Sequence, residues 1–378
     1  MSFFVPVLAT VLALLTVYLH RRLAVAPGWG RRTRIGTGLV LGLGWLTSLV
    51  GFAMLGGVID PNGRRWLAWA GLTWLAIGVY LLLGVLALGV AALVARLLRR
   101  PAARRRVLRA GTPAVAVLAV AATGWGLHEA ARPTVTAATV TSPDLPEAFD
   151  GLRIALLTDL HAGPVRDATF TRAAVDAINA AEPDLVVLGG DLVDGKVEQV
   201  ADVLAPLADL EAPLGVVAVS GNHEYISQEA DAWLAHWETL GITVLRNDSL
   251  VLTDPAGGTE TIRVAGINDL TATGDAAPDP DLALRDSDPA GFTLLVAHQP
   301  KSAELVQGRG VDLQLSGHTH GGQLWPFRWA VLLQQPVIDG LDAVGDVPVL
   351  TSRGAGAWGP PVRVLAPPEI PVVTVRRG

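Results

Sequence analysis

Five short motifs in the second half of the chain combine residue types that bind metal ions. In chain order they are Asp159-Leu160-His161, Gly190-Asp191, Gly221-Asn222-His223-Glu224, His298 and Gly317-His318-Thr319-His320. Each motif follows an apolar run that predicts a strand, and each offers carboxylate, amide or imidazole groups. Because the ends of several strands can meet at one edge of a sheet, we expect these groups to converge on a site for two metal ions.

The distribution of histidine supports a metal site. Five of the eight histidines lie in the motifs, and only three lie elsewhere: His20, His128 and His236. Each motif alone has an ordinary alternative, since a single histidine such as His298 is more often a satisfied core residue. The segment Gly317-His318-Thr319-His320-Gly321-Gly322 is far more specific. All five motifs in order favour a metal site over five unrelated core residues.

In type, order and spacing the motifs resemble those of the calcineurin-like metallophosphoesterase superfamily, over residues 150–378. Within that stretch, the segment 317–323 and the closing Pro368-Glu369-Ile370 are similar to its membrane-associated bacterial branch. The resemblance implies an α/β fold, namely a four-layer α/β/β/α sandwich. It also implies a metal-dependent phosphoric ester hydrolase, in which a metal-bound hydroxide attacks phosphorus in line.

The same resemblance implies a set of ligands for two divalent metal ions. It assigns three residues to the first ion: Asp159, His161 and His320. It assigns three to the second ion: Asn222, His298 and His318. Asp191 would bridge the two ions. A pocket so rich in imidazole suits Mn, Fe, Zn or Co better than Mg or Ca, and the choice among the four stays open.

Local backbone geometry predicts how neighbouring ligands are divided between the ions. Residues two apart point the same way in an extended segment, so we expect Asp159 and His161 to meet at one ion. His318 and His320 lie on a turn that is rich in glycine. Such a turn can bend, so that the two imidazoles reach different ions.

Three further residues are candidates for roles beside the metals. His223 directly follows a ligand and is better placed to donate a proton to the leaving-group oxygen than to bind an ion, so we name it with Asp191 as catalytic. Glu224 either orients His223 or lies behind the site. Arg353, in Ser352-Arg353-Gly354, is either a clamp for the phosphate or one half of a structural ion pair.

Residues 151–378 alternate apolar strands with amphipathic helices. Strand-like runs without long helices between them follow in the later part, and this mixture predicts two packed sheets flanked by helices. Residues 131–150 are rich in Thr, Ala and Pro, and we expect them to form an extended, exposed linker. The chain is therefore divided into a region of residues 1–130, this linker, and a metallophosphoesterase domain of residues 151–378.

Residues 1–130 contain four apolar stretches, each about as long as the 20 residues that cross a bilayer. They span residues 3–19, 35–59, 66–95 and 107–127. Arginine is concentrated in the first and third connecting loops, so the positive-inside rule predicts a multi-pass protein of the cell membrane with its N-terminus and catalytic domain outside. The segment 104–109 is either a twin-arginine export signal or an ordinary cytoplasmic anchor, and both alternatives give this orientation.

Charge and cysteine content exclude other classes of function. Residues 133–378 hold 33 of the 35 acidic residues, so nucleic acid is not an expected partner. The chain has no cysteine, which excludes a thiolate zinc site and a thiol nucleophile. The sequence carries no signal for an oligomeric state.

These observations predict a membrane-anchored phosphoesterase with two metal ions. Phosphodiester or pyrophosphate bonds are the expected targets, and anchoring is compatible with a lipid-linked substrate. The alternatives are a phosphomonoesterase or protein phosphatase, and a membrane sensor that binds metal without catalysis. Three aromatic residues after the last motif either pack in the core or form a rim at the membrane or substrate: Trp325, Phe327 and Trp329.

Overall fold

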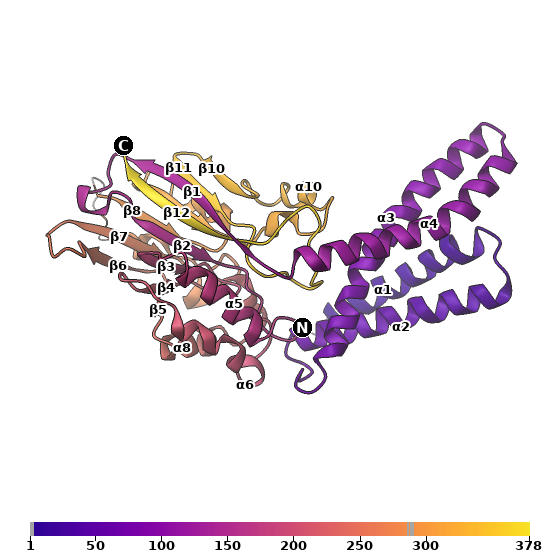
Figure 1. Ribbon diagram of the computed structural model, residues 1–378, viewed down its shortest axis with the longest axis horizontal. Coiled ribbons are helices and arrows are strands. Elements are labelled where there is room, and N and C mark those ends of the chain that lie inside the picture. The colour runs from indigo at the N-terminus through magenta and orange to yellow at the C-terminus, as the bar shows by residue number, and fades with distance from the viewer. Residues whose placement is uncertain (1–3, 286, 288–290) are drawn as a thin grey trace.

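The computed structural model describes residues 4–285, 287 and 291–378, and it has two parts: a helical bundle and an α/β sandwich (Figure 1). The four helices of the bundle are α1 (Phe4–His20), α2 (Arg31–Leu55), α3 (Arg65–Leu97) and α4 (Pro101–Glu129). A π-helical turn, Arg21–Val25, extends α1. All four helices are long and apolar enough to cross a membrane, which confirms the expected four-helix region.

The helix boundaries differ from the apolar stretches at several ends. The first stretch was expected from Phe3, which lies outside the described residues. The helix α4 starts at Pro101, six residues before the apolar run, because proline is favoured in the first turn of a helix. The loops that join α1 to α2 and α3 to α4 lie at the end of the bundle away from the sandwich (Figure 1).

Two six-stranded sheets form the centre of the sandwich. The first has the order β1-β12-β2-β3-β4-β5, and the second has the order β10-β11-β9-β8-β7-β6. The strands of the first sheet are β1 (Thr134–Ser142), β2 (Arg153–Leu157), β3 (Leu185–Leu188), β4 (Val216–Ala218), β5 (Thr243–Val244) and β12 (Glu369–Arg377). Those of the second are β6 (Asp248–Thr253), β7 (Thr261–Gly266), β8 (Thr293–Val296), β9 (Leu313–Ser316), β10 (Gly340–Val344) and β11 (Val347–Thr351).

Side chains alternate between the two faces of each sheet, and this alternation builds three separate cores. In β2, Ile154 and Leu156 face the second sheet and join one buried cluster with Leu294 and Leu315. The neighbouring Leu157 belongs instead to a cluster with the helices outside the first sheet. A third buried cluster covers the outer face of the second sheet. The result is the expected four-layer α/β/β/α order.

The helices of the sandwich are short. Those beside the first sheet are α5 (Ala168–Asn179), α6 (Val197–Val200), α7 (Asn222–Ile226) and α8 (Ala230–Thr239). Beside the second sheet lie α9 (Pro280–Ala283) and α10 (Arg328–Val331). Asp167 caps α5 by accepting hydrogen bonds from the backbone of Thr169 and Phe170. The segment after α6, residues 201–209, is a 3-10 helix with Pro206 inside it.

Residues 131–150 were expected as an exposed linker, but the structure has a strand within them. The strand β1 pairs in parallel with β12 over nine residues and forms the edge of the first sheet. Its Thr and Val residues favour an extended backbone, and its partner lies near the opposite end of the sandwich sequence. The sandwich therefore begins almost directly at the end of α4.

Candidate metal centre

The seven predicted ligands lie where strands end. Asp159, Asp191 and Asn222 follow β2, β3 and β4 of the first sheet, whereas His298 and His318 follow β8 and β9 of the second. The strands β2, β3 and β4 run parallel to one another, and so do β8 and β9. Their carboxyl ends consequently lie at one edge of the sandwich, and the structure brings all five motifs together there.

Five of these ligands have a backbone conformation that residues other than glycine seldom adopt. The φ angles are 54° for Asp159, 47° for His161, 52° for Asp191, 70° for His318 and 51° for His320. Asp159 and His161 were expected to share an extended segment, and here the structure differs, because both lie in left-handed turns. Such conformations persist only where surrounding structure holds them, and they are concentrated at functional sites.

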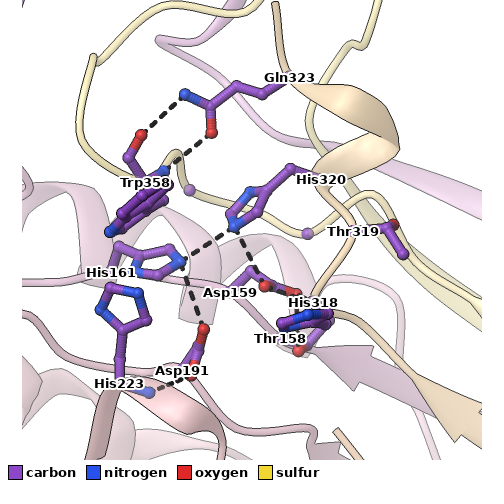
Figure 2. A network of polar contacts seen from close by, with 12 residues as sticks. Thr158, Asp159, His161, Asp191, His223, His318, Thr319, His320, Gln323 and Trp358 are labelled. Carbon is purple, nitrogen blue, oxygen red and sulfur yellow. Dashed lines mark hydrogen bonds and ion pairs between the residues drawn. The ribbon is translucent and has the colours of Figure 1, made fainter. Parts of the chain in front are cut away.

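Three ligands form a first buried cluster, which Figure 2 shows together with Asp191. His161 Nε2 lies 3.1 Å from His320 Nε2, and His320 Nε2 lies 3.3 Å from Asp159 Oδ1. Burial, together with His161 and Arg363, holds the pKa of His320 well below its usual range. Its imidazole is therefore neutral, as a metal ligand must be.

A second cluster lies on the other side of Asp191. His298 Nε2 is 3.2 Å from Asp191 Oδ2, and His318 Nδ1 is 2.8 Å from the amide oxygen of Asn222. Burial and the nearby His298 lower the pKa of His318. The donor atoms of the buried Asp191 and His298 and of the half-buried His318 all lie within 4.8 Å of one another.

Asp191 contacts both clusters. Its Oδ2 atom lies 3.8 Å from His161 Nε2 as well as 3.2 Å from His298, while its Oδ1 atom accepts a hydrogen bond from the backbone of His223. Burial alone would raise the pKa of Asp191, but the nearby histidines His298, His223 and His161 outweigh it and hold that pKa well below its usual range. The carboxylate is thus ionised and lies between the two groups of donors.

The donor atoms fit divalent ions in chemistry and in spacing. Atoms that share an ion at about 2.1 Å lie roughly 3 to 3.5 Å apart, close to the separations found in the first cluster. His298 donates from Nδ1 to the carbonyl of Gly189 at 2.8 Å. Burial would lower the pKa of His298, but the nearby Asp191 outweighs it and raises that pKa well above its usual range, so a bound ion would take the place of the proton on Nε2. That Nε2 atom is buried and has no hydrogen-bond partner among the described residues. A buried imidazole held in this way is a typical metal ligand.

His223 lies beside the clusters and contacts a carboxylate that the sequence interpretation missed. Its Nδ1 atom is 2.6 Å from Asp194 Oδ1, and the same oxygen is 3.3 Å from His161 Nδ1. Burial would lower the pKa of His223, but Asp191 and Asp194 outweigh it and raise that pKa to about 9. Asp194 therefore fixes the orientation of both rings, and it holds His161 with Nε2 beside the Nε2 atom of His320.

Glu224 is fully buried, and its carboxylate forms hydrogen bonds with backbone N–H groups. It does not orient the ring of His223. Its carboxylate accepts hydrogen bonds from the backbone N–H groups of Asp191, Leu192 and Gly221, at 3.1, 3.0 and 2.7 Å. These contacts tie the loop after β3 to the loop after β4. Burial and the nearby Asp191 raise the pKa of Glu224 to about 7.

Arg353 is engaged by other side chains. Its guanidinium pairs with Glu369 at 2.5 Å and lies 3.7 Å from Asp339, which matches the structural ion-pair alternative. A second arginine, Arg363, is fully buried behind His320. It donates to the carbonyls of Gly356 at 2.7 Å and of His320 at 3.2 Å, and burial lowers its pKa to about 9. Arg363 thus supports the loop that carries the last two histidines.

The sequence offered only weak signals for these two supporting residues. Asp194 lies three positions after Asp191 on the same loop, and a second carboxylate so close to a ligand could have drawn attention. Arg363 lies in the segment Pro361-Val362-Arg363-Val364, which resembles a strand and carries no motif. Its importance depends on a fold that returns this segment to the histidine loop.

The site opens into a cavity of about 530 Å³. Five polar residues of the site line one part of it: Asp191, Asn222, His223, His318 and His320. The ring of Trp358 meets that of His223 edge-on, with centroids 5.8 Å apart. Gln323 exchanges hydrogen bonds with the backbone of Trp358 and holds the tryptophan loop at the rim (Figure 2).

Known proteins similar to this chain share its second half. The family model for calcineurin-like phosphoesterases matches residues 152–322. A Helicobacter pylori protein described as an uncharacterized metallophosphoesterase is 42% identical over 58% of this chain and 58% of its own length. A Bacillus subtilis protein with the same description, YkuE, is 30% identical over 72% of this chain and 97% of its own length.

The similarity also extends into the helical half and beyond bacteria. A zebrafish (Danio rerio) protein, described as a transmembrane protein with metallophosphoesterase domain, is 32% identical over 83% of this chain and 74% of its own length. The chain spans only about 58% of the length of the Helicobacter relative. With its motifs at one edge of the sandwich and this degree of identity, the chain belongs to the calcineurin-like metallophosphoesterase family.

Proposed function

We propose that this chain hydrolyses phosphoesters with the help of two divalent metal ions. The observation that supports this best is the pair of donor clusters that the ionised Asp191 contacts, one of them buried and the other partly buried. One ion would be held by three residues: Asp159, His161 and His320. The other would be held by Asn222, His298 and His318. Asp191 would bind both ions. When bound, the ions would neutralise phosphate oxygens and lower the pKa of the attacking water. Mn, Fe, Zn and Co all suit this donor set.

His223 is the proposed proton donor to the leaving group. Its Nδ1 atom is bound to Asp194, no described residue forms a hydrogen bond with its other ring nitrogen, and the residue lines the cavity. A histidine beside two carboxylates retains its proton at neutral pH, which suits a general acid. Asp194 and Glu224 do not act on the substrate in this proposal, since they hold His223 and the loop of Asp191 in place.

The bond attacked is proposed to be a phosphodiester or a pyrophosphate, in a lipid-linked molecule. No lysine or arginine occurs among the described residues that line the cavity, and Arg353 is paired with Glu369. A monoester carries two negative charges at neutral pH and gains more from such cations than a singly charged diester does. The lining therefore favours a diester over the phosphomonoesterase and protein phosphatase alternative.

The catalytic part is proposed to lie outside the cell membrane. The loops rich in arginine, around Arg31 and Arg100, lie at the end of the bundle away from the sandwich (Figure 1). The positive-inside rule assigns that end to the cytoplasm. The metal centre would then be on the opposite side, together with the loop between α2 and α3.

A test of the activity uses the purified full-length chain in detergent, stripped of metal and then supplied with Mn²⁺. We expect Mn²⁺-dependent hydrolysis of bis(p-nitrophenyl) phosphate, at least about tenfold faster than that of p-nitrophenyl phosphate. Asp191→Ala should lower kcat by about 10³-fold, because both ions lose a shared ligand. Asp231→Ala, at a carboxylate that is 97% exposed and belongs to neither cluster, is the matched control.

Three other results of this assay would each change the proposal. Faster hydrolysis of the monoester would replace the diester proposal with a phosphomonoesterase. Binding of two Mn²⁺ ions without turnover of either ester would support the membrane sensor. Activity that survives in Asp191→Ala would contradict the ligand assignment.

A further inference from the structure

The cavity of the metal centre has one wall that comes from a membrane helix. Besides the metal ligands, its lining includes Leu75 and Val79 of α3, and Phe327 and Val331 of the segment around α10. These four side chains are all apolar. The cavity therefore joins the two halves of the molecule. Its lining combines metal-binding donor atoms with hydrocarbon side chains, and the part lined by these four residues is called its apolar end.

This wall is a fixed part of the structure. Ala76 of α3 is fully buried in one cluster with Leu324 and Val362, which flank the histidine loop and the Arg363 segment. At the start of α3, Arg65 donates to the carbonyl of Gly163 at 2.8 Å, and Trp69 donates to that of Val165 at 3.1 Å. The helix is thus held against the sandwich along several turns.

The position of the wall along α3 places it at the edge of the bilayer. The helix has 33 residues, whereas about 20 are enough to cross the hydrocarbon layer. Counting about 20 residues back from Arg96, at the basic end, leads to the stretch between Leu75 and Val79. The apolar end of the cavity consequently lies near the outer boundary of the hydrocarbon layer.

The segment around α10 carries a second membrane-like surface at the same cavity. Trp325 is 51% exposed, Trp329 67% and Leu333 87%, so the aromatic residues after the last motif do not all pack in the core. Arg328, the charged residue of this segment, is paired with Asp339 at 2.8 Å. Exposed tryptophan and leucine side chains are typical of surfaces that enter the membrane interface.

We propose that Leu75, Val79, Phe327 and Val331 bind a hydrocarbon chain of a membrane lipid phosphoester. The chain enters from the bilayer between α3 and the α10 segment, while the phosphate group reaches the metal ligands. This inference rests on the proposed function. It gives the bundle a second role, because α3 supplies part of the substrate-binding site in addition to anchoring the protein.

The test compares two aryl phosphodiesters that differ only in their second alcohol: p-nitrophenyl hexadecyl phosphate and p-nitrophenyl methyl phosphate. The full-length protein is assayed in mixed micelles with Mn²⁺, and the ratio of kcat/KM for the two esters is the readout. We expect the wild-type protein to prefer the hexadecyl ester at least tenfold. Val79→Trp, which fills the apolar end, should lower that ratio about tenfold, the equivalent of about two buried methylene groups.

Val90→Trp is the matched control, because Val90 lies on the same helix, is 64% exposed and is absent from the cavity lining. Its ratio should equal that of the wild-type protein. Equal rates for the two esters in the wild-type protein would overturn the subsite, and so would a Val79→Trp ratio that matches the control.

Failure of the proposed function would give a different result from failure of the subsite. If the wild-type protein hydrolyses neither ester, the phosphoesterase proposal is wrong, and the subsite is then judged by binding. A hexadecyl phosphate with a diazirine in its chain should label the α3 peptide around Leu75 and Val79, and Val79→Trp should reduce that labelling. Labelling spread evenly along the exposed faces of α3 would overturn the subsite as well.

Discussion

Asp194 connects His161, a member of the first cluster, with His223, which lies beside it. Its Oδ1 atom is near Nδ1 of both His161 and His223, at 3.3 and 2.6 Å, and its side chain is buried. We predict that Asp194→Asn weakens Mn²⁺ binding and lowers kcat, each by about 10- to 100-fold, because removal of a partner behind a ligand costs that much. Metal titration and steady-state kinetics on the same preparation measure both effects.

Asp209→Asn serves as the control for this substitution, since the Asp209 carboxylate is 60% exposed, pairs with Arg172 and does not line the cavity. Thermal unfolding separates positioning from general damage. An Asp194→Asn protein that binds Mn²⁺ as tightly as the wild type would show that the carboxylate does not position His161.

The sequence predicted which side chains belong to the site better than it predicted their backbone conformations and their partners. The motifs correctly indicated which residues gather at one edge of the sandwich. They did not indicate the left-handed turns at Asp159 and His161, because backbone strain depends on the loops packed around it. Arg353 drew attention through its glycine-rich context, yet Glu369 engages it. A residue's partner from a distant part of the fold is invisible in local sequence.

The loop after β9 depends on a glycine for its path past the first cluster. A Cβ atom on Gly317 would lie 2.1 Å from Asp159 Oδ2 and 2.3 Å from Thr158 Oγ1. We predict that Gly317→Ala displaces Asp159 or the loop of His318. The protein should then bind about one Mn²⁺ ion in place of two and lose at least about 10²-fold in kcat, because ligand geometry tolerates little displacement. Metal content after gel filtration measures the stoichiometry.

Gly124→Ala is the appropriate comparison, since a Cβ atom at Gly124 would meet nothing within 4 Å and the residue lies in a helix. It should retain two ions and full activity. Two tightly bound ions in Gly317→Ala would mean that the loop can shift without loss of the first site.

Long and strongly patterned elements were predictable, whereas edges and short helices were not. The four apolar helices and the central strands follow directly from hydrophobic patterning. The strand β1 was expected as a linker, because its alternating Thr, Ala and Val residues identify a strand only when β12 is present beside it. The short α6 is followed over residues 201–209 by a 3-10 helix, in which Pro206 lacks a backbone donor.

The orientation of the whole molecule can be tested cleanly because the chain contains no cysteine. Ala102 lies in the first turn of α4, beside the loop from α3, and Ala256 lies in the turn between β6 and β7; both are exposed. We predict that a membrane-impermeant maleimide labels Ala256→Cys in intact spheroplasts. It should label Ala102→Cys only after permeabilisation, because the arginine-rich end is expected in the cytoplasm.

The wild-type chain gives the background of this experiment, and Mn²⁺-dependent activity of each variant shows that it is folded. Labelling of Ala102→Cys alone in intact spheroplasts would reverse the proposed topology. It would place the metal centre in the cytoplasm.

The junction between α4 and β1 determines which membranes the site can reach. The carbonyl of Ala130 is held by buried Arg166, that of Gly126 accepts from the backbone of Arg363, and β1 begins at Thr134. So short a connection holds the site at a fixed distance from the helical bundle, and in the proposed topology it would fix the height of the site above the bilayer. A lipid substrate would then be supplied by two-dimensional diffusion within one leaflet. Turnover would follow the mole fraction of that lipid in the membrane, and vesicles that merely pass nearby would not be processed.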